Sequence, residues 1–405
     1  MRVYIGIDWS KRKHSICLMH ENGEVLGSLE IGHTLAGFVE LDQRRRQLGV
    51  KAEECVVGLE TAHSLLVDYL WDQGYHPVYI LPPQAVKSAQ GRFRQSGAKD
   101  DPWDARLIAD ILRTDQRRYT PWQPDLPLTR HIRAEVRFVY QLNKARVRHT
   151  NQLLAVLWRY YPAATQIFSK MDGLVSLAFL QAYPTPQAAA GLSFEDFKVF
   201  LRAHHHTHRR SWAHADSRLQ ADYPPAKPEI VAAYAPQALG LARLLEQVVH
   251  LKKEALARLQ ELYAQHPDHV LYDPLPVAGD LTEPALLAKL GDDRGRFPTP
   301  SVLQAVAGTC PVTYQSGKGR KVFFRQACDH QFRTTLQQWA RLTIQVSPWA
   351  EAYFRTVRPR CSSENDAIRR LANRWLEVVW RVWHDRKPYD EEYHLKQHTL
   401  RTKPK

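Results

Sequence analysis

Residues 2–31 read RVYIGIDWSKRKHSICLMHENGEVLGSLEI, and their alternating apolar and polar side chains predict three consecutive strands. These strands are expected at 2–9, 14–20 and 24–31, because Glu21-Asn22-Gly23 is a favoured hairpin turn. The elements expected after them are a helix at 35–48, a strand at 54–60, a helix at 64–74, a strand at 76–82 and a helix beginning in DDPWDARLIADILR. The order βββαβαβ followed by a helix predicts a mixed sheet with helices on its faces, as in a ribonuclease-H-like domain.

Four acidic residues stand at the ends of these elements: Asp8, Glu60, Asp101 and Asp104. Asp8 and Glu60 each end an apolar run, where an unpaired carboxylate costs stability if it is buried. Asp101 and Asp104 are three residues apart and therefore share one face of a helix. Carboxylates gathered at one sheet edge are typical of a Mg²⁺ site, and paired Mg²⁺ ions are widely used in phosphodiester chemistry.

Asp101 has a second interpretation. Asp101-Pro102-Trp103-Asp104 also matches a helix start, with an N-cap, a proline in the first position and an acid in the third. A capping carboxylate has fewer lone pairs left for a metal, which makes Asp104 the firmer ligand of the two. Asp100 could replace Asp101 in either role.

The chain has 405 residues, a net charge of +14 and five cysteines without a CxxC pair. The excess of positive charge favours a polyanionic partner such as nucleic acid. The cysteine pattern argues against a zinc ribbon and fits a reducing compartment. No signal-peptide pattern and no apolar stretch of about 18 residues is present, so we expect a cytoplasmic protein without a membrane partner.

The segment 126–161 alternates apolar and cationic positions at helical spacing. Its cations face a single acid, Glu135, and are Arg130, Arg133, Arg137, Lys144, Arg146, Arg148 and Arg159. We expect a helix with one apolar stripe and one stripe that contacts nucleic-acid backbone. A solvated face beside a neighbouring domain is the alternative.

The segment 162–228 is rich in Pro and Ala and is expected to be irregular. It contains a histidine cluster without a carboxylate or cysteine framework: His204, His205, His206, His208 and His214. This pattern favours a polar loop or an RNA-facing surface over a metal site.

Residues 237–266 carry a heptad seam that includes Leu241, Leu245 and Leu259 and is interrupted by Lys252. Bundle packing, an antiparallel coiled coil with 126–161 and a dimer seam all fit. The expected division of the chain is 1–120 for the acidic α/β domain, 121–268 for a helical, coiled-coil region with the irregular insertion 162–228, 269–390 for a mainly helical C-terminal domain and 391–405 for a basic tail. The tail is expected to be disordered from His394 onward.

The segment Gln315-Ser316-Gly317-Lys318-Gly319-Arg320-Lys321 places a hydroxyl between glycines and cations. Glycine allows close backbone approach to a phosphate, and Lys318, Arg320 and Lys321 could stabilise its charge. Ser316 could then act as a nucleophile. A polar turn between two strands is the alternative.

Taken together, the chain resembles the DEDD transposases of bacterial insertion sequences, which include RNA-guided bridge recombinases and are related to Piv-type invertases. The resemblance spans nearly the whole chain and is carried by GIDWSKRKHSICL, VVGLETAHSLLVDYL, KDDPWDARLIADIL, YPTPQAAAGLSFEDFKVFLRAH, LPVAGDLTEPALLAKLGDDRGRF and AVAGTCPVTYQSGKGRKVFFR. Where the family often has a Pro-Gly-Ile-Gly hairpin, this chain has Pro276-Val277-Ala278-Gly279.

The resemblance implies a RuvC-like domain that holds Mg²⁺ or Mn²⁺ through Asp8, Glu60, Asp101 and Asp104. It implies a C-terminal transposase domain whose catalytic Ser316 forms a covalent 5′-phosphoserine link to DNA. It further implies donor and target DNA and a structured noncoding bridge RNA as partners. The implied assembly is a homodimer or a dimer of dimers with composite sites.

Three other functions are compatible with parts of the pattern. A RuvC-like junction nuclease would use water instead of Ser316 as the nucleophile. An actin-like kinase would need a second phosphate loop and a glycine-rich adenosine site, for which the sequence has no convincing pair. An RNA-binding protein without catalysis would differ from the transposase only in activity.

Overall fold

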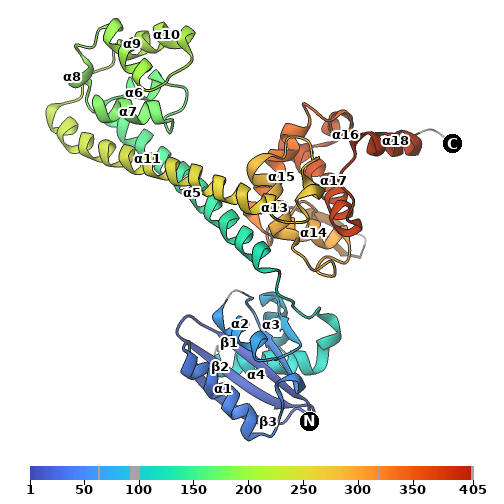
Figure 1. Cartoon of the computed structure of the whole chain (residues 1–405). Coiled ribbons are helices and arrows are strands. Elements are labelled where there is room, and N and C mark those ends of the chain that lie inside the picture. Colours follow the sequence, from blue (N-terminus) through green and yellow to red (C-terminus); the bar gives the residue numbers. More distant parts are fainter. Residues whose placement is uncertain (63, 92–100, 318, 403–405) are drawn as a thin grey trace. The chain divides into compact units, whose positions relative to one another are not determined.

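The computed structural model describes residues 1–62, 64–91, 101–317 and 319–402, with the side chains of Asp101 and of residues 397–402 left out. The chain divides into two compact units, Met1–Pro124 and Asp125–Lys405. Each unit has hydrophobic cores of its own, and Figure 1 labels the elements of both units.

The first unit contains a mixed sheet of five strands in the order β3-β2-β1-β4-β5. The strands are β1 (Val3–Trp9), β2 (Lys13–His20), β3 (Val25–Gly32), β4 (Cys55–Leu59) and β5 (Val78–Ile80). β1 pairs antiparallel with β2 and parallel with β4, so the N-terminal hairpin lies beside a strand that the chain reaches through a crossover connection. The predicted order βββαβαβ is confirmed and is consistent with a ribonuclease-H-like domain.

Helices cover both faces of this sheet. They are α1 (Leu35–Gln47), α2 (Leu65–Asp72), α3 (Pro83–Gln90) and α4 (Asp101–Asp115), with the short 3₁₀ helices η1 (Ala52–Glu54) and η2 (Gln116–Arg118). Alternation along β1 sends Ile5 and Ile7 into a core with α1 and α2, and Tyr4 into a core with α3 and α4. The sequence pattern does not predict helix α3, because its eight residues carry only a short apolar pattern.

The second unit contains two long helices, α5 (Pro127–Tyr160) and α11 (Pro228–Ala264). They lie side by side and run antiparallel: Ile132 near the start of α5 shares a core with Leu259 near the end of α11, and Leu157 shares another with Ala242 (Figure 1). The predicted helices at 126–161 and 237–266 are confirmed. The heptad seam of α11 lies in these cores, which matches bundle packing.

The expectation that 162–228 is irregular is wrong. The segment forms the helices α6 (Ala164–Ile167), α7 (Leu174–Ala182), α8 (Pro186–Ala189), α9 (Phe194–Ala203), η3 (Arg209–Ser211) and α10 (Trp212–Leu219). Each helix is too short to show a full amphipathic period, so their shared core of Phe179, Phe197 and Trp212 was not visible in the pattern. We call this part the head.

The rest of the second unit is mainly helical, as predicted for 269–390. Its elements are α12 (His269–Tyr272), α13 (Gly279–Leu290), α14 (Pro300–Ala307), β6 (Val312–Ser316), β7 (Gly319–Phe323), α15 (His330–Thr343), α16 (Pro348–Val357), η4 (Arg358–Arg360), α17 (Glu364–Asp385) and α18 (Glu391–Thr402). Trp339, Trp375 and Trp383 are fully buried and form part of its core.

The tail does not match the predicted disorder, because α18 continues to Thr402. Asp390 accepts a hydrogen bond from the Tyr393 amide at 3.0 Å, and His394 packs on the Trp349 ring with centroids 4.7 Å apart. The first contact caps the start of α18, and the second packs the helix on the C-terminal core. Across the described ranges, no helix has both the length and the apolar character needed to cross a bilayer.

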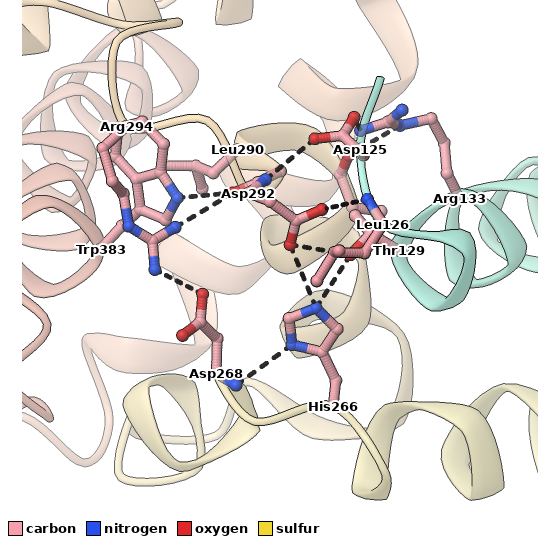
Figure 2. A network of polar contacts seen from close by, with 12 residues as sticks. Asp125, Leu126, Thr129, Arg133, His266, Asp268, Leu290, Asp292, Arg294 and Trp383 are labelled. Carbon is pink, nitrogen blue, oxygen red and sulfur yellow. Dashed lines mark hydrogen bonds and ion pairs between the residues drawn. The ribbon is translucent and has the colours of Figure 1, made fainter. Parts of the chain in front are cut away.

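A polar network holds the start of α5 against the C-terminal helices (Figure 2). His266 is buried, and its Nε2 lies 2.8 Å from Thr129 Oγ1 and 3.3 Å from Asp292 Oδ1. The Asp292 carboxylate also accepts from the Leu126 amide at 2.7 Å. Burial would raise the pKa of Asp292, but the donors from His266, Leu126 and Thr129 outweigh it and lower that pKa. The network therefore holds a charged carboxylate that caps the first turn of α5.

Candidate catalytic residues

Asp8 and Glu60 meet at one edge of the five-stranded sheet. β1 and β4 are parallel neighbours in which Ile7 pairs with Leu59, so Asp8 and Glu60 are the next residues of the two strands. Both are partly exposed. Their convergence follows from topology, because parallel strands bring their carboxyl ends to the same edge.

Both acids also lie on the face covered by α4. A Cβ on Gly6 would come within 2.0 Å of the Ala105 carbonyl oxygen, and one on Gly58 within 2.4 Å of a Leu112 methyl carbon. The two glycines thus let α4 lie almost directly on the sheet. Because side chains alternate along a strand, Asp8, two residues beyond Gly6, projects to this same face.

The direction of α4 brings its first turn to the acidic edge. Ala105 lies over Gly6, while Arg113 reaches the turn at Gly23, at the opposite end of the sheet. Asp104, which precedes Ala105, is 7% exposed and accepts a hydrogen bond from the Gln90 amide at 3.4 Å. Asp8, Glu60 and Asp104 therefore come from three separate elements to one edge, which we call the acidic edge.

Asp101 begins α4, but its side chain and Asp100 lie outside the described residues. Its role as a ligand or as a cap stays a prediction. In the ranges that the structure describes, no three His, Cys, Asp or Glu side chains are gathered closely enough to hold a metal ion. The described carboxylates share an edge without forming a ready-made cage, as expected for like charges that repel one another.

Behind the acidic edge lies a pair of histidines that the sequence analysis did not single out, with His14 buried and His33 partly exposed. His14 pairs with Trp9 across β1 and β2, and its Nε2 lies 2.8 Å from His33 Nδ1. Burial, with a smaller contribution from His33, lowers the pKa of His14 from 6.5 to about 4. The ring is therefore neutral at pH 7 and adds no positive charge of its own behind the carboxylates. Its signal was a histidine in the strand pattern KHSICLMH.

Ser316 lies at the tip of an exposed hairpin formed by β6 and β7. It pairs with Gly319 across a two-residue turn, and Gly317 in that turn has a φ of 56°, which favours glycine. The turn between two strands, given above as the alternative, is present, and the catalytic role of Ser316 stays a prediction. Lys318 lies outside the described residues.

The cations of the hairpin fall on different faces. Tyr314 pairs with Lys321 and Gln315 pairs with Arg320, so alternation puts Lys321 on the Ser316 face and Arg320 on the other. Both cations are exposed. Lys321 is therefore the better placed of the two to accompany a phosphate at Ser316.

The base of the hairpin is anchored by contacts with two helices. The Phe324 ring lies between two guanidinium groups, with Arg333 4.5 Å and Arg369 4.9 Å from its centroid. Arg333 also donates to the Arg325 carbonyl oxygen at 3.0 Å. These contacts tie the end of β7 to α15 and α17, whereas the strands themselves form a separate two-stranded sheet.

The predicted cationic stripe of α5 separates into an outer and an inner set. Exposed cations recur at spacings of seven, seven and four, on one face of the helix: Arg130, Arg137, Lys144 and Arg148. Arg133 points inward, where Nη2 lies 2.5 Å from Asp125 Oδ2 and Nε donates to the Ala288 carbonyl oxygen (Figure 2). Arg146 pairs with Asp172 at 3.2 Å. Arg133 thus has an intramolecular role that its charge alone did not reveal.

Two transposase family models match the chain. The IS110-type DEDD transposase model, described as "Transposase", matches residues 5–162, which include the acidic edge. The model described as "Transposase IS116/IS110/IS902 family" matches residues 273–355, which include the hairpin.

Curated proteins similar to this chain are named as putative transposases or as proteins of insertion elements. The "Mini-circle putative transposase for IS117" of Streptomyces coelicolor is 29% identical over 401 residues, covering 97% of this chain and 96% of that protein. The "Insertion element IS900 uncharacterized 42 kDa protein" of Mycobacterium paratuberculosis is 25% identical over 399 residues, covering 96% and 97%. The "Putative transposase y4uE" of Sinorhizobium fredii is 29% identical over 203 residues, half of this chain and 56% of that protein.

Proposed function

Because the chain belongs to the IS110/IS116 family of DEDD insertion-sequence transposases, we propose that it cleaves and rejoins DNA strands through Ser316. The observation that carries the proposal is a solvent-exposed hydroxyl on a glycine turn, within the segment matched by a transposase model. The first unit acts as a RuvC-like domain in this proposal, and its acidic edge is required for the same chemical step.

The reaction is a pair of transesterifications. Ser316 Oγ attacks the phosphorus of a scissile phosphodiester, the P–Oγ bond forms, the P–O3′ bond breaks, and the Oγ proton passes through solvent to the leaving O3′. A 3′-hydroxyl of another strand then attacks the phosphoserine, breaks the P–Oγ bond and returns a proton to Ser316. Because each bond is replaced by one of the same type, no ATP is needed.

Asp8, Glu60 and Asp104, with Asp101, would hold the Mg²⁺ or Mn²⁺ used by the reaction. Hard carboxylate oxygens are the ligands these ions prefer, and a bound ion supplies charge stabilisation to phosphate oxygens. The pairing of Ile7 with Leu59 and the close approach of α4 to Gly6 support this proposal. Lys321, on the Ser316 face of the hairpin, would balance phosphate charge.

We further propose a structured noncoding guide RNA as a partner, beside donor and target DNA, with the protein acting as a dimer or a dimer of dimers. The net charge of +14 and the outer stripe of Arg130, Arg137, Lys144 and Arg148 suit backbone contacts that do not depend on base sequence. Sequencing of the RNA that copurifies with the full chain tests this part. Enrichment of RNA from DNA flanking the gene is expected, and RNA with no such enrichment would contradict it.

The nucleophile is tested by trapping the covalent adduct on supercoiled DNA with the full chain. Ser316→Ala should abolish the adduct while DNA binding persists. Thr313→Ala is the matched control, since it removes an exposed hydroxyl from the same strand on the other face. An adduct in Ser316→Ala, or free 5′-phosphate ends formed without regard to Ser316, would instead support the nuclease that uses water.

A further inference from the structure

The head contains a basic cavity that the proposed reaction does not use. It has a volume of about 700 Å³ and lies between the end of α6 and the segment from His206 to Arg218. A volume of this size is typical of sites for small organic groups. We call it the head cavity.

The lining of the head cavity carries positive charge and no acid. It includes three arginines and three histidines but no Asp or Glu: Arg209, Arg210, Arg218, His206, His208 and His214. Arg218 donates to the Gln166 carbonyl oxygen at 3.1 Å and so links α10 to α6. Arg209 and Arg210 are exposed, and within the described part of the chain neither has an acidic partner. Two adjacent guanidinium groups of this kind suit a phosphate.

An aromatic wall adjoins these cations. Phe168 lines the head cavity, with its ring centroid 6.0 Å from that of His206. The Trp212 indole N–H donates to His206 Nδ1 at 2.8 Å, which leaves the Nε2 atom of a neutral ring as the donor. Burial, with the neighbouring His208, lowers the pKa of His206 and keeps the ring neutral. A fixed N–H donor beside an aromatic ring suits a planar base with acceptor atoms.

We propose that the head cavity binds one unpaired nucleotide of a nucleic-acid strand, with the phosphate at Arg209 and Arg210 and the base against Phe168. A base held in a duplex is stacked on both sides and cannot lie against a protein ring. A metal site is the poorer interpretation, because no carboxylate or cysteine stands beside the histidines among the residues that line the cavity. The inference rests on the proposed function only in taking nucleic acid as the natural partner.

The test measures binding of the full chain to fluorescent 12-nucleotide oligomers: single-stranded RNA, single-stranded DNA and a hairpin duplex. Arg209→Ala with Arg210→Ala should weaken single-strand binding roughly tenfold and lower the slope of log affinity against log salt by about 1. Phe168→Ala should weaken it several-fold without changing that slope. Arg117→Ala with Arg118→Ala is the matched control, since it is also an exposed arginine pair on a 3₁₀ helix.

Equal single-strand affinity in the head and control variants would overturn the inference. So would a head variant that loses as much affinity for the duplex as for the single strands. A preference for RNA or for DNA in the wild type, lost in the head variant, identifies the source of the nucleotide and supports it. Ultraviolet cross-linking of 5-iodouridine oligomers provides a second readout, with peptides from 206–218 expected. Binding requires no strand cleavage, so failure of the Ser316 proposal would leave this result intact, and the reverse also holds.

Discussion

The acidic edge and the Ser316 hairpin carry their candidate catalytic side chains on very different supports. Asp8 and Glu60 extend from strands whose preceding residues are fully buried, and α4 packs so tightly on them that Gly6 has no room for a Cβ. Ser316 lies on an exposed, separate pair of strands, whose described contacts with α15 and α17 include the Phe324 ring at the base. The comparison teaches that the carboxylates depend on the integrity of a core, whereas the hydroxyl depends on a local anchor.

The largest effect should come from filling the contact between α4 and β1. Gly6→Ala places a Cβ 2.0 Å from the Ala105 carbonyl oxygen and 2.5 Å from the Ala109 nitrogen, so α4 must shift. We expect the free energy of unfolding of the first unit to fall by about 3 kcal/mol, together with loss of adduct formation. Thermal unfolding is the measurement. Gly91→Ala, where nothing lies within 4 Å, is the control, and equal stability of both variants would break the comparison.

A smaller, pH-dependent effect should come from His14. Its folded-state pKa of about 4 lies below the ordinary 6.5, so the stability it contributes is complete above about pH 6.5 and is lost as the pH falls toward 4. His14→Gln should therefore reduce the acid sensitivity of the first unit by about 2 kcal/mol between pH 7 and 4.5. Urea titrations at several pH values measure this, with His20→Gln on the same strand as control. Parallel pH profiles for wild type and His14→Gln would contradict the assignment.

Removal of the Phe324 anchor should change stability less than the Gly6 and His14 substitutions do. Phe324→Ala removes the ring between Arg333 and Arg369, and each exposed cation–π contact contributes about 0.5–1 kcal/mol. Hydrogen exchange of the β6 and β7 amides should accelerate several-fold, and adduct formation should slow, while global stability changes by about 1 kcal/mol. Val322→Ala, also exposed on the hairpin, should leave exchange near wild type. Unchanged exchange in Phe324→Ala would show that the hairpin is held by other contacts.

The smallest effect on stability should come from the residue with the largest effect on chemistry. Ser316 is exposed, so Ser316→Ala should change the free energy of unfolding by less than about 0.5 kcal/mol. Differential scanning calorimetry measures this beside the trapping experiment. A loss above about 1 kcal/mol would mean that the hydroxyl has a structural role, and that loss of the adduct alone could not assign the nucleophile.

The strand ends and the long helix of the basic segment could be predicted because their patterns are local. Asp8 and Glu60 follow apolar runs, and parallel pairing brings such ends together. Other features depend on tertiary contacts that no local pattern encodes. The head is built from helices of three to ten residues around one core, Arg133 turns inward to Asp125, and α18 packs on Trp349 through His394. The face of the hairpin on which Arg320 lies depends on how β6 and β7 pair, which the sequence alone does not give.

The central claim is that the acids of three elements form one divalent-metal site, and Mn²⁺ binding measured by electron paramagnetic resonance tests it most directly. We expect the wild-type chain to bind Mn²⁺ and Asp8→Asn, Glu60→Gln and Asp104→Asn each to weaken binding at least tenfold. Asp110→Asn, on the same helix but paired with Arg113 at 2.6 Å, should bind like wild type. Wild-type Mn²⁺ affinity in both Asp8→Asn and Asp104→Asn would contradict the account.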